Sequence, residues 1–167
     1  RTIPKDRGMV RVRRGIRDPL EEEMALGNLN LICYYNVYYY PREMNREFDR
    51  AIFLENTTAA EPARFEDVYV RLLKKLSIAG RGRPLLLKNP ASTARLPLLE
   101  RLFPGVRYVF IVRNPFEVFA SMLHHYPRVF HAFAWQKFDD IDLEEMVLYK
   151  YRRLLKGYLE QKDVGLP

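Results

Sequence analysis

The sequence has little cysteine: Cys33 is the only one among its 167 residues. One thiol excludes an internal disulfide framework and a metal site built from clustered thiolates, and it favours a reducing compartment. No apolar run approaches the roughly 18 residues that a membrane-spanning helix needs. No apolar stretch typical of a secretory signal follows residues 1–5. We therefore expect a cytoplasmic protein without a membrane-spanning segment.

Glycine is also scarce, and the eight glycines form neither a Walker motif nor another phosphate-binding loop. The pair at Gly80 and Gly82 is more typical of the end of a helix. No set of side chains shows the spacing of a metal site, so we expect no metal.

Apolar residues make up 48% of the chain and charged residues 29%, which is the composition of a globular domain. The net charge of +7 suits a polyanionic partner such as nucleic acid, an acidic membrane or a nucleotide-like cofactor. No helix-turn-helix or RNA-binding signature is present, so nucleic acid is the least favoured of these. The chain begins at Arg1 rather than methionine, and we interpret it as an internal piece of a longer protein.

Helical and strand-like patterns alternate along the chain. Helices are expected at 18 to about 33, 42–53, 65–78, 92–103, 114 to about 126 and 142–161, with Asp18 and Asn114 as N-caps and Asp142 in a capping position. Two short apolar runs, at 84–88 and 107–113, are typical of buried parallel strands. This order predicts an α/β fold, a helix-rich three-layer domain with a parallel sheet.

A cation ends each predicted strand: Lys88 the first and Arg113 the second. Ligands of such folds bind beyond the carboxyl ends of the strands, so both side chains would reach one anion site. Ser121 follows Asn114 by close to two helical turns and would face the same anion. The alternative is that both cations are solvated residues that merely end buried strands.

Six sequence blocks carry a resemblance to a known family. They are PLEEEMAL at 19–26, LLLKNP at 85–90, TARL at 93–96, LERLFPGVR at 99–107, IVRNPFEVFAS at 111–121 and LHHY at 123–126. Together they resemble the core of the PAPS-dependent sulfotransferases, where PAPS is 3′-phosphoadenosine-5′-phosphosulfate. The resemblance implies a P-loop-NTPase-like architecture, incomplete here because the family's 5′-phosphate loop is absent. It also implies one partial domain with a basic lead-in (1–17), a helical acceptor-side region (18–83), a PAPS-binding core (84–126) and a C-terminal helical region (127–167).

The resemblance assigns roles to four residues. Arg113 and Ser121 would bind the 3′-phosphate of PAPS, and Lys88 would approach the sulfuryl group and the leaving 5′-phosphate. The histidine that cytosolic members carry shortly after this lysine is missing. Other branches use a glutamate on an early helix as the base, which indicates one of residues 21–23. Glu23 is favoured, because it matches the last acid of the branch's acidic triplet.

The three acids have a second interpretation, since carboxylates in the first turn of a helix complement its dipole. The activity implied is sulfuryl transfer from PAPS to a hydroxyl or amine of a carbohydrate, phenol, alcohol or amine, which releases PAP. The alternative is a non-catalytic or truncated sulfotransferase-like module that binds an anion or a partner protein.

Overall fold

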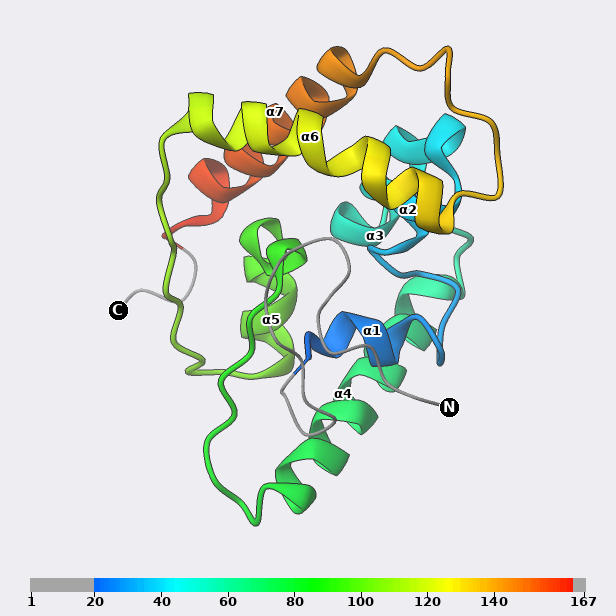
Figure 1. Ribbon diagram of the computed structural model, residues 1–167. Helices are drawn as coiled ribbons and strands as arrows, with labels where there is room; N and C mark the ends of the chain where they lie inside the picture. The colour runs from blue at the N-terminus through cyan, green and yellow to red at the C-terminus, as the bar shows by residue number, and fades with distance from the viewer. Residues whose placement is uncertain (1–19, 164–167) are drawn as a thin grey trace, which may run out of the picture.

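The computed structural model describes residues 20–163, and every regular element in that range is a helix (Figure 1). The elements in chain order are α1 (Glu22–Leu26), α2 (Asn36–Tyr39), η1 (Pro41–Glu43), α3 (Met44–Phe53), α4 (Glu61–Ala79), η2 (Pro90–Ala94), α5 (Leu96–Leu102), α6 (Pro115–Phe133) and α7 (Leu143–Gln161). The basic lead-in expected at 1–17 and the helix cap expected at Asp18 lie outside the described residues.

The predicted α/β fold with a parallel sheet is wrong for residues 20–163, which contain no strand. The two apolar runs are extended, but no backbone hydrogen bond joins one to the other. Their side chains are exposed instead of buried: 94% for Leu86, 86% for Val109 and 78% for Val112. A strand needs a neighbour to complete its ladder, and the described residues supply none for either run.

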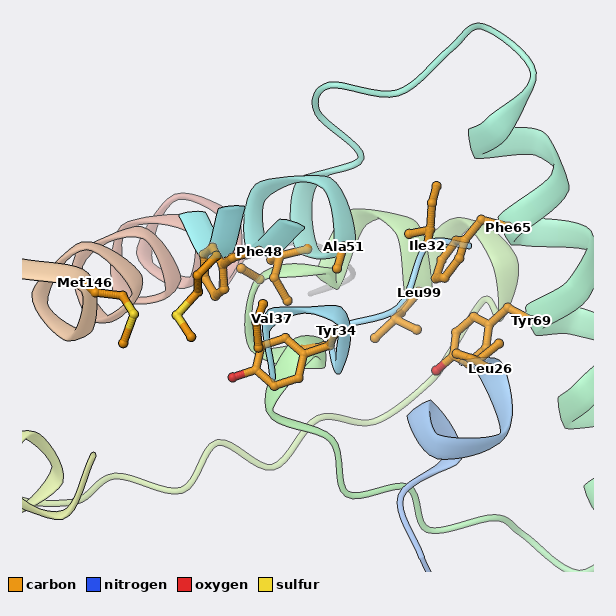
Figure 2. Close-up of a cluster of buried hydrophobic side chains, with 14 of the residues drawn as sticks. Leu26, Ile32, Tyr34, Val37, Phe48, Ala51, Phe65, Tyr69, Leu99 and Met146 are labelled. Carbon is orange, nitrogen blue, oxygen red and sulfur yellow. The ribbon is translucent and has the colours of Figure 1, made fainter. Parts of the chain in front are cut away.

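The core runs through the middle of the helical assembly, as Figure 2 shows. Met146 of α7 and Phe48 of α3 lie at one end of it, and Phe65 and Tyr69 of α4 at the other. Helix α7 packs against η2 at close range, because a Cβ on Gly157 would come within 2.8 Å of the Ala94 side chain. A glycine at this position therefore permits the contact.

Several helix ends follow the sequence signals. The side chain of Asn114 caps α6 by accepting a hydrogen bond from the backbone N–H of Phe116 at 3.0 Å, which confirms the expected cap. Asp142 caps α7 in the same way, by accepting from Glu145 at 3.0 Å. The first helix is much shorter than expected, because α1 ends at Leu26 and Gly27 follows it as the C-cap.

Candidate functional site

Three consecutive carboxylates at the start of α1 face different surroundings. Glu21 precedes the first turn in an extended conformation, and Glu22 and Glu23 begin the helix. Successive helical residues point about 100° apart, so neighbouring side chains diverge. The Glu21 side chain is 18% exposed, whereas Glu22 and Glu23 are buried. The triplet therefore does more than complement a helix dipole.

Glu23 forms a buried ion pair with Arg95. The two guanidinium nitrogens Nη1 and Nη2 donate to Oε2 at 2.9 Å and to Oε1 at 3.2 Å. The backbone N–H of Tyr34 donates to Oε1 at 2.6 Å, and the Asn89 amide donates to Oε2 at 2.8 Å. Burial alone would raise the pKa of Glu23, but the Arg95 charge and these hydrogen bonds hold it below its ordinary value. The carboxylate is ionised and fully engaged.

Arg95 is a central residue to which the sequence analysis assigned no role. Its Nε and Nη2 donate to the carbonyl of Ala51 at 3.0 and 2.6 Å, and its guanidinium lies 5.2 Å from the centroid of the Phe65 ring. These contacts tie α1, α3 and α4 to the turn that follows η2. An arginine between apolar neighbours, in TARL at 93–96, is the only sequence signal for this role.

Asn89 links the buried carboxylates to the segment that carries Lys88. Its amide nitrogen donates to Glu22 at 3.0 Å as well as to Glu23. Its side-chain oxygen accepts from the backbone N–H of Ala91 at 2.9 Å and so caps η2. The hydroxyl of Tyr69 also donates to the same Glu22 oxygen, at 3.3 Å. Lys88 therefore precedes an anchored residue.

Lys88 contacts Glu21, not Glu23. Its ammonium donates to Oε1 of Glu21, and the hydroxyl of Tyr35 donates to Oε2 of the same carboxylate at 2.6 Å. The Lys88 side chain is 71% exposed, so the pair lies at the surface. Glu21 and Lys88 each adjoin, in sequence, a member of the buried network formed by Glu22, Glu23, Asn89 and Arg95. An ammonium next to a carboxylate at an accessible position is an arrangement that can exchange protons and stabilise developing negative charge.

Arg113 and Ser121 lie at the start of α6 and are exposed. Arg113 immediately precedes the Asn114 cap, and Ser121 follows in the second turn of the helix. Within residues 20–163, the hydrogen bonds and the ion pair of Glu23 involve neither of them, and the carboxylate that contacts Lys88 is Glu21. The argument that two strand ends bring the cations together does not hold for these residues, because the strands are absent.

Within residues 20–163, no group of three or more His, Cys, Asp or Glu side chains could hold a metal ion. Likewise, no helix in this range is both long and apolar enough to cross a membrane.

Comparison with known proteins gives the same family as the sequence blocks. A family model described as "Sulfotransferase family" matches residues 20–165. Two curated relatives, from Mycobacterium bovis and Mycobacterium tuberculosis, are named omega-hydroxy-beta-dihydromenaquinone-9 sulfotransferase Stf3, and each is 24% identical over 159 residues. That alignment covers 93% of this chain, which spans 40% of the length of these relatives. No solved structure matches significantly.

Proposed function

Because the chain belongs to the sulfotransferase family, we propose that it takes part in transferring a sulfuryl group from PAPS to an acceptor hydroxyl or amine, releasing PAP. The observation that carries this proposal is the family match over residues 20–165, which includes Glu23, Lys88, Arg113 and Ser121. A hydroxyl is the favoured acceptor, since the curated relatives are named for a hydroxy compound.

Arg113 and Ser121 are the residues proposed to bind the 3′-phosphate of PAPS. Both side chains are exposed, and Arg113 makes no ion pair with a carboxylate of residues 20–163, so the residues present fit an anionic group. The N-terminus of the 19-residue helix α6 adds its positive dipole end beside them. A guanidinium and a hydroxyl can distinguish PAP from 5′-AMP, which lacks the 3′-phosphate.

Lys88 is the residue proposed to stabilise the leaving group. As the bond between sulfur and the bridging oxygen breaks, negative charge grows on the 5′-phosphate, and a nearby ammonium offsets it. The exposure of the Lys88 side chain supports this role, because most of its length is accessible from the surface. The acidic triplet beside it supplies the carboxylate that would take the acceptor proton.

Replacing Arg113 with alanine is expected to weaken PAP binding by about 1.5–3 kcal/mol, the contribution of a charge-assisted hydrogen bond. Isothermal titration calorimetry of the full-length protein with PAP measures this change. 5′-AMP is the control ligand, and its affinity should hardly change in Arg113→Ala. Equal affinity of wild type and variant for PAP would refute the assignment of this residue to the 3′-phosphate.

A second candidate function is a sulfotransferase-like module that binds PAP or a partner without catalysis. The exposed Arg113 and Ser121 would serve such a module equally well, because binding an anion needs no catalytic base. The two functions differ in one result, because a binding module would retain PAP affinity and transfer no sulfuryl group.

A further inference from the structure

The three carboxylates of the acidic triplet differ in how much of each is available to an incoming substrate. A general base must come within hydrogen-bond reach of the proton that it removes, about 2.6–3.2 Å between heavy atoms. Glu23 is 0% exposed, and both of its oxygens already accept hydrogen bonds. Glu22 is 5% exposed, and its Oε1 accepts from Asn89 and Tyr69. Neither carboxylate can meet an acceptor without opening the core.

Glu21 has the opposite surroundings. Its side chain reaches the surface, and its Oε1 faces the ammonium of Lys88, a residue whose side chain is 71% exposed. Tyr35 holds the other oxygen through a hydrogen bond of 2.6 Å, which fixes the orientation of the carboxylate. Glu21 is therefore the member of the triplet that stands beside a second group proposed for catalysis.

We propose that Glu21 is the general base that removes the proton from the acceptor hydroxyl, and that Glu23 is a positioning residue. This inference rests on the proposed sulfotransferase function. In the absence of donor, Glu21 pairs with Lys88. The anionic donor competes for the ammonium, which leaves Oε1 of Glu21 to accept a hydrogen bond from the acceptor.

The step is balanced in atoms and charge. The acceptor oxygen forms a bond to sulfur while its proton passes to the Glu21 carboxylate. The bond between sulfur and the bridging oxygen breaks, and its electron pair stays on the 5′-phosphate of PAP, next to the Lys88 ammonium. The products are the sulfated acceptor, PAP and a protonated Glu21, which returns its proton to solvent.

The buried network explains how the two groups come to face each other. Arg95 and Glu23 fix α1, whose preceding residue is Glu21. Asn89 binds both buried carboxylates and is the residue after Lys88. One set of hydrogen bonds therefore fixes the backbone on both sides of the pair, which is how a catalytic constellation is held in place.

The experiment compares two acceptors that differ in their need for a base. At mildly alkaline pH phenol remains protonated, whereas 4-nitrophenol is largely ionised and needs no proton removal. The full-length protein is given PAPS with a radiolabelled sulfuryl group, and transfer to phenol, to 4-nitrophenol and to water is measured. In Glu21→Gln, we expect kcat with phenol and with water to fall about 10²–10⁴-fold. With 4-nitrophenol, the loss of kcat should be at least about tenfold smaller than with phenol. The affinity of the variant for PAP should stay near that of wild type.

Glu144→Gln is the matched control, because Glu144 is an exposed carboxylate in the first turn of α7, and its activity should equal that of wild type. Two results would overturn the assignment of Glu21 as the base. In the first, Glu21→Gln transfers the sulfuryl group to phenol as fast as wild type does. In the second, its kcat falls by the same factor with phenol and with 4-nitrophenol. If the wild-type protein transfers label to none of the three acceptors, the proposed sulfotransferase function is overturned. The assignment of Glu21 as its general base then falls as well.

Discussion

Replacing Glu23 with glutamine is expected to lower the free energy of unfolding by about 3–5 kcal/mol, because it leaves the Arg95 charge buried without its partner. Arg95 is 2% exposed and Glu23 is 0% exposed, so water cannot replace the lost carboxylate. Urea unfolding of wild type and variant, followed by circular dichroism, measures the difference. The same change should disturb Asn89, whose amide donates to Glu23 at 2.8 Å.

The double variant Glu23→Gln/Arg95→Met separates the ion pair from the other contacts of Glu23. Removing both charges avoids an unpaired ion, so we expect the double variant to be less destabilised than the sum of the two single variants. Additive losses would show that the two charges are not coupled. A loss below about 1 kcal/mol in Glu23→Gln would contradict the buried pair altogether.

The stabilisation from Glu23 should also depend on pH. The pKa of this carboxyl is lowered in the folded protein by Arg95 and the surrounding hydrogen bonds, which outweigh burial. Its contribution is therefore complete above the unfolded pKa of about 4.3 and is lost as pH falls through the folded value. The difference between wild type and Glu23→Gln should shrink in that acidic range.

Replacing Lys150 with methionine is expected to stabilise the protein, by an amount that grows as pH is lowered from about 10. Lys150 is 4% exposed, and within residues 20–163 no carboxylate forms an ion pair with it. Its amine donates to the Tyr126 hydroxyl and lies 3.3 Å from the sulfur of Met44. Aromatic rings surround it, with the centroid of Phe48 at 5.8 Å.

Burial lowers the pKa of Lys150 well below its ordinary value. Between the folded pKa and the unfolded value of about 10.4, the unfolded chain binds one more proton than the folded protein, so wild-type stability rises with pH. The slope from one such group is about 1.4 kcal/mol per pH unit. Methionine has a similar volume and no proton to bind, so Lys150→Met should lose this slope.

Urea unfolding of both proteins at several pH values isolates this group, because all other titrating residues are common to both. Lys156→Met is the control, since Lys156 is exposed on the same helix, and its difference from wild type should not vary with pH. A constant difference between wild type and Lys150→Met from pH 7 to pH 10 would contradict a pKa of Lys150 that burial lowers.

The helical part of the fold followed from local sequence signals. Apolar spacing predicted a helix at 65–78 where α4 occupies Glu61–Ala79, and the caps at Asn114 and Asp142 form as expected. These signals work because caps and apolar faces depend on residues a few positions apart. The runs at 84–88 and 107–113 differ, because a strand depends on a partner that local sequence does not reveal.

The buried network could not be predicted in the same way. Glu23 and Arg95 are 72 residues apart in the sequence, and neither lies in a pattern that requires the other. The family resemblance indicated the acidic triplet at 21–23 as the source of a base, but the sequence could not show which carboxylate faces outward. Lys150 lies in a helix rich in Lys and Arg, so nothing in its surroundings along the chain marks it as buried.

The most direct test of the central claim is transfer of a radiolabelled sulfuryl group from PAPS by the full-length protein. The wild type is predicted to label a hydroxyl acceptor, whereas Lys88→Ala should bind PAP with similar affinity and transfer about 10²–10³ times more slowly. A wild-type protein that binds PAP and transfers no label, or a Lys88→Ala variant as fast as wild type, would contradict it.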